Sequence, residues 1–164
     1  MYACDRGQDR IQVFDKVGNL QKIIHVIPGT GTPGIGTAGS AWDVDFSTDK
    51  RQEVMFNADG GNEVVWIFDR LAALAGAALD SMPGQGILAG FGRPGHQAGE
   101  FTFLHTVTVD SKGDLYIGET VGGRRIQKFI RRGHVPDKKL EVFVPPGNPS
   151  ELLPHYNPVK DDKD

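Results

Sequence analysis

Acidic and basic side chains recur in the same place around short polar turns. Asp5 precedes a turn and Arg10 follows it, and Glu119 stands in the same relation to Arg124 or Arg125. A carboxylate at this position can accept turn N–H groups and can form an ion pair with an arginine across a hairpin. The pattern predicts a structural clamp for each turn, and a ligand-binding rim is the alternative role.

A second candidate for chemistry is His105, which lies near the start of the alternating stretch "LHTVTV". Strict alternation places Leu104 and the two threonines on one face, and His105 with the two valines on the other. A buried imidazole without a partner would cost about 1–3 kcal/mol, so an inward-facing His105 needs one. Trp42 occupies the equivalent position in an earlier part of the chain, where an indole can pack or stack on a ligand.

Other motifs that could carry chemistry are weak. The remaining histidines are scattered without ligand spacing, and Cys4 is the single cysteine, so no internal disulfide can form. The glycine-rich "GFGRPGHQAGEF" joins two strands rather than a strand and a helix, which argues against a phosphate loop. The serines lie in no nucleophile-elbow context. The histidines in question are His25, His96, His134 and His155.

Composition limits the classes of function. The 164 residues suffice for one domain with a sizeable core, and 38% hydrophobic with 24% charged residues is typical of a soluble globular protein. The formal net charge of -3 gives no basic field for nucleic acid or an anionic membrane. No apolar run approaches the roughly 18 residues that span a bilayer. The sequence therefore predicts neither a nucleic-acid partner nor a membrane span.

The turn motif belongs to a longer internal repeat. The stretch "DRGQDRIQVFD" from Asp5 matches "DGGNEVVWIFD" from Asp59, although Val64 replaces the arginine. A third copy, "ETVGGRRIQKF", starts at Glu119 and has one extra residue in its turn. A short strand is expected before each turn, so residues 2–15, 54–69 and 115–129 should form the same hairpin. Several short strands in each repeat are typical of a propeller.

One segment breaks the pattern of strands. The run "RLAALAGAALD" is rich in alanine and leucine but has no cap. It predicts either an outer-strand region or a short helical insertion.

The third copy carries a family resemblance. "GEFTFLHTVTVDSKGDLYIGETVGGRRIQKF" resembles an NHL repeat, the blade of a six-bladed β-propeller family, whose order is an inner strand, D-x-x-G-x-[IL]-Y-[VI]-x-[DE], a turn and R-[IV]-Q-x-F. Residues 101–129 match it throughout, residues 2–15 match its second half, and the middle copy is looser. The resemblance implies an all-β fold, a partial propeller of four-stranded antiparallel blades in an incomplete arc.

The repeat also sets the expected domain boundaries. Residues 1–144 form the partial propeller, and the Pro-rich, charged tail 145–164 is expected to be mostly unstructured. Because six blades need far more residues, we expect the chain to be a fragment that can self-associate through unpaired strand edges. The blades are A (1–27, without its inner strand), B (40–92) and C (101–144).

The same stretch also resembles repeats of peptidyl-α-hydroxyglycine α-amidating lyase, a propeller enzyme. The resemblance implies a zinc ion held by channel histidines from alternating blades, with His105 as one ligand in the full-length protein. Three imidazoles would leave a position open for substrate or water. The pattern is kept in part, because Leu104 replaces the usual proline and Trp42 stands at the equivalent position of blade B.

Two functions follow from these resemblances. The first is a non-catalytic NHL propeller that binds a protein, a peptide or a small ligand at one face, with Trp42 as a channel-facing candidate. The alternative is a zinc-dependent lyase of the peptide-amidating type, with its other metal ligands in missing blades. Resemblance to bacterial propellers implies a secreted or periplasmic location. Fold alone does not decide between the two functions.

Overall fold

The computed structural model describes residues 1–29, 39–79 and 86–132. The predicted tail 145–164, the end of blade C, His134 and His155 lie outside these residues. The described part is all-β, as predicted, with ten strands in three antiparallel sheets. Sheet A contains β1 (Tyr2–Asp5), β2 (Arg10–Phe14) and β3 (Leu20–His25); sheet B contains β4 (Asp43–Phe46), β5 (Val54–Asp59), β6 (Val64–Asp69) and β7 (Ile87–Phe91); sheet C contains β8 (Leu104–Val109), β9 (Leu115–Glu119) and β10 (Ile126–Phe129).

Strand register shows that the sequence repeat is a structural repeat. Asp5 pairs with Arg10 between β1 and β2, and in the next copy Asp59 pairs with Val64 between β5 and β6. In sheet C the extra residue lies in the turn before β10, so that Gly118 of β9 pairs with Ile126 of β10. This pair corresponds to Cys4 and Ile11 of sheet A. The prediction of one hairpin repeated three times is confirmed.

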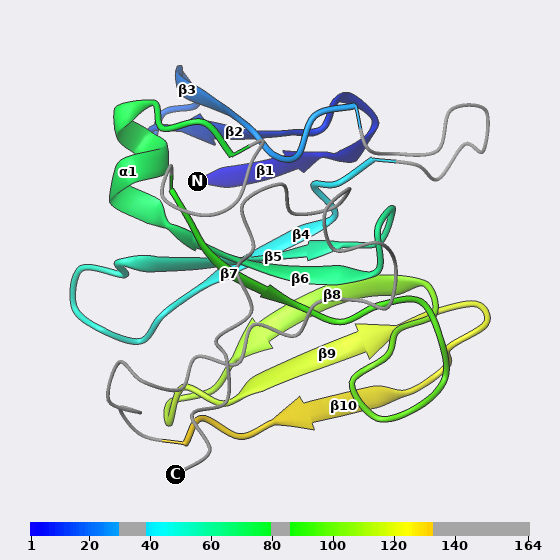
Figure 1. Cartoon of the computed structure of the whole chain (residues 1–164). Coiled ribbons are helices and arrows are strands. Elements are labelled where there is room, and N and C mark those ends of the chain that lie inside the picture. Colours follow the sequence, from blue (N-terminus) through cyan, green and yellow to red (C-terminus); the bar gives the residue numbers. More distant parts are fainter. Residues whose placement is uncertain (30–38, 80–85, 133–164) are drawn as a thin grey trace, which may run out of the picture.

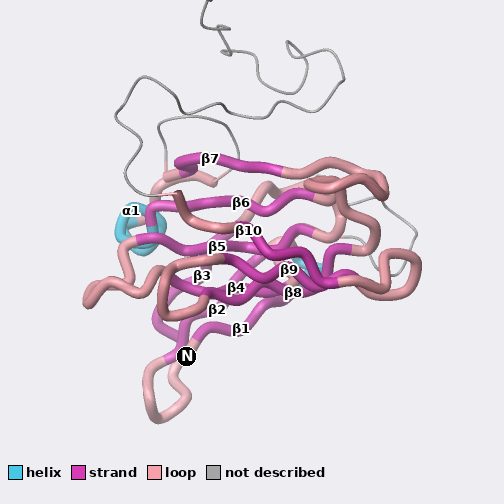
Figure 2. The backbone as a smooth tube through the Cα atoms, turned by 90° about the horizontal axis from the view of Figure 1, so that it is seen from below, coloured by secondary structure: helices cyan, strands magenta, loops and turns pink. Residues whose placement is uncertain are grey.

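The three sheets stack in chain order, with sheet A at one end and sheet C at the other (Figure 1). One core cluster lies between sheets A and B and includes Ile11, Met55 and Phe68. A second lies between sheets B and C and includes Val65 and Ile117. Viewed from below, β1, β4 and β8 gather on one side, and β7 lies at the opposite margin (Figure 2).

The alanine-rich run is a short helical insertion, which was one of the two predicted alternatives. Helix α1 spans Arg70–Ala75, and Ala73 is buried in the first core cluster. Its N-cap is Asp69, whose side chain accepts a hydrogen bond from the backbone N–H of Ala72 at 2.9 Å. The expectation of an uncapped run was wrong, because the cap is Asp69, the last residue of the repeated strand motif. No helix among the described residues is long and apolar enough to cross a membrane.

Candidate functional site

Two of the three turn carboxylates form ion pairs with arginine. Arg10 Nε and Nη2 each lie 2.8 Å from Asp5 Oδ2 in sheet A. In sheet C, Arg125 Nε donates to Glu119 Oε1 at 2.6 Å. The sequence left Arg124 as an alternative partner, but its guanidinium donates to the Val121 carbonyl instead.

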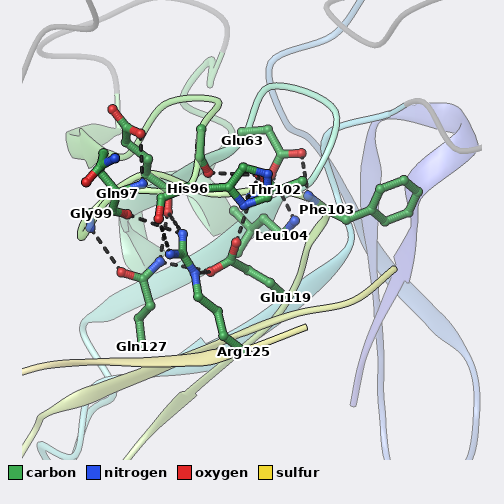
Figure 3. Close-up of polar contacts among 12 residues, drawn as sticks. Glu63, His96, Gln97, Gly99, Thr102, Phe103, Leu104, Glu119, Arg125 and Gln127 are labelled. Atoms are coloured by element: carbon green, nitrogen blue, oxygen red, sulfur yellow. Dashed lines mark hydrogen bonds and ion pairs between the residues drawn. The ribbon is translucent and has the colours of Figure 1, made fainter. Parts of the chain in front are cut away.

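Glu119 is the centre of a dense polar network (Figure 3). Its side chain is fully buried, and it accepts hydrogen bonds from the Thr102 N–H at 2.7 Å and from Gln127 Nε2 at 2.8 Å. Burial opposes ionisation, but the bonds from Arg125, Thr102 and Gln127 outweigh it and hold the pKa of Glu119 below its usual value. Because these donors all come from inside the protein, this carboxylate is better suited to a clamp than to a ligand-binding rim.

The network also holds the loop that precedes β8. Arg125 donates to the carbonyl oxygens of His96, Gln97 and Glu100, the last at 2.7 Å. Gln127 donates to the Glu100 carbonyl at 2.8 Å and accepts the Gly99 N–H at 3.0 Å. Arg125, in the turn before β10, and Gln127 of β10 therefore fix the loop that contains His96, Gly99 and Glu100 (Figure 3).

Asp59 is fully buried and is stabilised by neutral donors instead of an arginine. Trp66 Nε1 donates to it at 2.8 Å, Asn62 Nδ2 at 2.7 Å, and the N–H groups of Gly61 and Asn62 at 3.1 and 2.9 Å. Burial raises the pKa of Asp59 to about 6, although all these donors favour the charged form. Val64 stands where the other two copies have an arginine, so the hairpin places no arginine opposite this carboxylate.

We expect the folded state to become more stable by roughly 1 kcal/mol when the pH falls from 7 to 5. Because the folded pKa of Asp59 is raised to about 6, its stabilising contribution is full below its unfolded value and is lost as pH rises through 6. Urea unfolding at the two pH values measures the effect. The Asp59→Asn variant should lose most of this pH dependence; an unchanged dependence in the variant would assign it to another group.

Two acidic residues that sequence reasoning missed join neighbouring sheets. Glu63 accepts the N–H groups of Phe103 at 2.7 Å and Leu104 at 2.9 Å, where sheet C begins. Asp9, the equivalent residue of the first copy, accepts the Ser40 N–H at 2.9 Å just before sheet B. Both have left-handed backbone conformations, with φ of 57° and 50°. Aligning the repeats would have revealed them, because both are acidic and directly precede the second hairpin strand.

A second missed pair lies on β4, at the edge that faces β8. The Asp43 carboxylate accepts the Thr106 hydroxyl and the Val107 N–H, the latter at 3.1 Å. Asp45 does the same two residues further along, with Thr108 at 3.0 Å and Val109 N–H at 2.7 Å. These side chains replace backbone pairing between β4 and β8, which therefore run side by side in the same direction.

His105 lies in a β-bulge that changes the predicted alternation. Leu104 pairs with Glu119 and Thr106 with Gly118, so His105 has no partner on β9. Leu104 and Val107 are both buried, whereas His105 is exposed. The extra residue of the bulge resets the alternation, so the prediction that His105 shares the face of the two valines was wrong.

The bulge brings the two residues singled out from the sequence into contact. The His105 ring lies edge-on to the Trp42 ring, with centroids 5.5 Å apart, and Phe103 approaches the same indole at 5.8 Å. The Arg6 guanidinium carbon lies 4.6 Å from the Trp42 ring centroid, in cation–π geometry. We call Arg6, Trp42, Phe103 and His105 the Trp42 cluster.

Local backbone geometry fixes this cluster. Arg6 begins the 3-10 turn η1 (Arg6–Gln8), which passes directly over Gly39. Gly39 has φ of 121°, and a Cβ there would lie 1.7 Å from the Arg6 carbonyl oxygen, so glycine is required. Trp42 Nε1 donates to the Gly39 carbonyl at 2.6 Å, which sets the orientation of the indole.

The described residues do not build the zinc site implied by the lyase resemblance. No group of three His, Cys, Asp or Glu side chains among them is arranged to hold a metal ion. The neighbour of His105 at the equivalent position of sheet B is Trp42, whose indole N–H is already bonded to Gly39. His105 is thus one imidazole beside aromatic rings.

Comparison with known proteins does not assign the chain to a family. A scan against models of known protein families finds no match, and a search of curated proteins finds no significant match.

Proposed function

We propose that the chain is a binding scaffold of the NHL β-propeller type, in which sheets A, B and C are successive blades. The common hairpin register of the three sheets and their stacking in chain order support this arrangement. The Trp42 cluster is the binding surface. It gathers one cation and three rings, from sheets A, B and C, where β4 and β8 begin.

One observation carries the choice of this surface. The side chains of Arg6 and His105 are exposed, flank the Trp42 ring, and form no hydrogen bond or ion pair with any described residue. The other acidic and basic groups discussed above are engaged in clamps and in links between sheets. An unpaired guanidinium beside aromatic faces suits a carboxylate that adjoins an aromatic group. The ligand is therefore a peptide segment with neighbouring acidic and aromatic side chains.

The test uses a capped peptide with adjacent phenylalanine and glutamate, and the same peptide with glutamine in place of glutamate. The acidic peptide should shift the indole N–H resonance of Trp42 while that of Trp66, bonded to Asp59, stays in place. Arg6→Ala should weaken binding about tenfold or more, as expected for loss of a charge-assisted hydrogen bond. Titration by NMR or calorimetry measures both effects.

Arg51→Ala is the matched control, because Arg51 is an exposed arginine in the turn after β4, at the other end of that strand. It should bind the peptide like the unchanged chain. Equal losses in both variants, or equal binding of the two peptides, would contradict the proposal. Equimolar zinc that disappears in His105→Ala would instead support the lyase-like alternative, with further ligands from outside the described residues.

A further inference from the structure

Each interface between sheets uses the same alternate residues of the repeat. In sheet A, Tyr2, Cys4, Ile11 and Val13 pack toward sheet B. In sheet B the equivalent residues, among them Ala58 and Val65, pack toward sheet C. Ile11 and Val65 are equivalent and both are 0% exposed. In sheets A and B, the face formed by these residues is therefore buried against the next sheet along the chain.

No sheet of the described residues covers the equivalent face of sheet C. Ile126 corresponds to Ile11 and Val65, yet it is 75% exposed. Its neighbours on the face are Gly118, Tyr116 and Lys128, with the Lys128 ammonium 4.9 Å from the centroid of the Tyr116 ring. Neither Ile126 nor Tyr116 belongs to a core cluster of the described residues. We call this surface the C face.

Sheet A has the complementary surface, which no described sheet covers, at the other end of the stack (Figure 1). It is the side that, in sheets B and C, packs on the preceding sheet. Phe14 corresponds to Phe68, which is fully buried in sheet B, but Phe14 is only half-buried and lies outside both clusters. Leu20 pairs with Phe14 and is 48% exposed. With Ala3, Gln12 and Ile23, these residues form the A face.

We propose that the C face of one chain docks on the A face of a second copy. The chain already forms this type of interface twice, between sheets A and B and between sheets B and C. The two open faces are the unmatched halves of the same interface. Two copies related by a two-fold axis would form it twice more, in a closed head-to-tail dimer. The apolar residues of both faces then leave water, which drives association.

Two single variants test the proposal, and each blocks one face. Ile126→Asp places a charge on the C face, and Leu20→Asp places one on the A face. The unchanged chain should have the mass of two chains in size-exclusion chromatography with light scattering. Each variant alone should weaken dimerisation by about 30-fold, the size of a hot-spot loss. An equimolar mixture should recover dimer, because one copy keeps its A face and the other its C face.

Val17→Asp is the matched control, since Val17 is 83% exposed in the turn between β2 and β3 and lies on neither face. It should dimerise like the unchanged chain, and circular dichroism should show the same β-structure in every variant. A monomeric unchanged chain across the concentration series overturns the proposal. The proposal is also overturned if Leu20→Asp remains dimeric while Ile126→Asp is monomeric and mixing the two variants does not recover dimer of Ile126→Asp. That result would mean that the C faces of two copies bind each other.

Discussion

Arg125→Ala will destabilise the folded chain by about 3 kcal/mol or more, because it leaves the buried Glu119 carboxylate without its counter-ion. The variant also removes the hydrogen bonds to the carbonyl groups of Gln97 and Glu100 that fix the loop before β8. The midpoint of urea unfolding measures the loss. Adding Glu119→Gln to the variant should recover part of the stability, since no unpaired charge is then buried.

The repeat supplies the control for this prediction. Arg10→Ala removes the equivalent ion pair of sheet A, where the side chains of Arg10 and Asp5 are 30% and 33% exposed. Its loss should cost about 1 kcal/mol or less, as is usual for ion pairs in contact with solvent. Similar losses in the two variants would show that burial of Glu119 does not set the strength of the clamp.

Glu63→Ala will destabilise the chain by about 2–4 kcal/mol, because the N–H groups of Phe103 and Leu104 lose their acceptor at a site where Leu104 is fully buried. Burial raises the pKa of Glu63, while these two N–H groups favour its charged form. The amide of Leu104 should also exchange hydrogen much faster in the variant. Hydrogen exchange followed by NMR tests the contact directly.

Glu53→Ala is the comparison for Glu63. Glu53 is an exposed glutamate in the turn between β4 and β5, paired with the exposed Arg51. Its removal should change stability by no more than about 0.5 kcal/mol and leave the exchange of Leu104 unaltered. If Glu63→Ala behaves in the same way, the link between sheets B and C does not depend on this carboxylate.

The local parts of the fold were predictable from the sequence. Alternation and turn residues predicted the hairpins, and the internal repeat predicted their common register. The bulge at His105 was not predictable, because a strictly alternating pattern does not indicate where one extra residue is inserted. Nor did the sequence choose between Arg124 and Arg125, because a turn with an added residue can present either one.

The contacts between sheets were the least predictable part of the site. Glu63 and Leu104 are 41 residues apart, and Asp43 and Val107 are 64 residues apart. Periodicity within one strand cannot report which side chain reaches the next sheet. The contact of Trp42 with His105 is of the same kind. Both residues were candidates, but their meeting depends on how sheet C packs on sheet B.

The aspartates of β4 also occupy hydrogen-bond donors along the edge of β8. An edge strand with free backbone N–H groups can template a strand of another molecule. Here the carboxylates of Asp43 and Asp45 accept the N–H groups of Val107 and Val109, the groups that an incoming strand would use on β8. An incoming strand would have to displace both charged groups from the edge of β8. These carboxylates thereby oppose strand pairing at the edge of β8, whereas the proposed contact between copies uses the faces of sheets A and C.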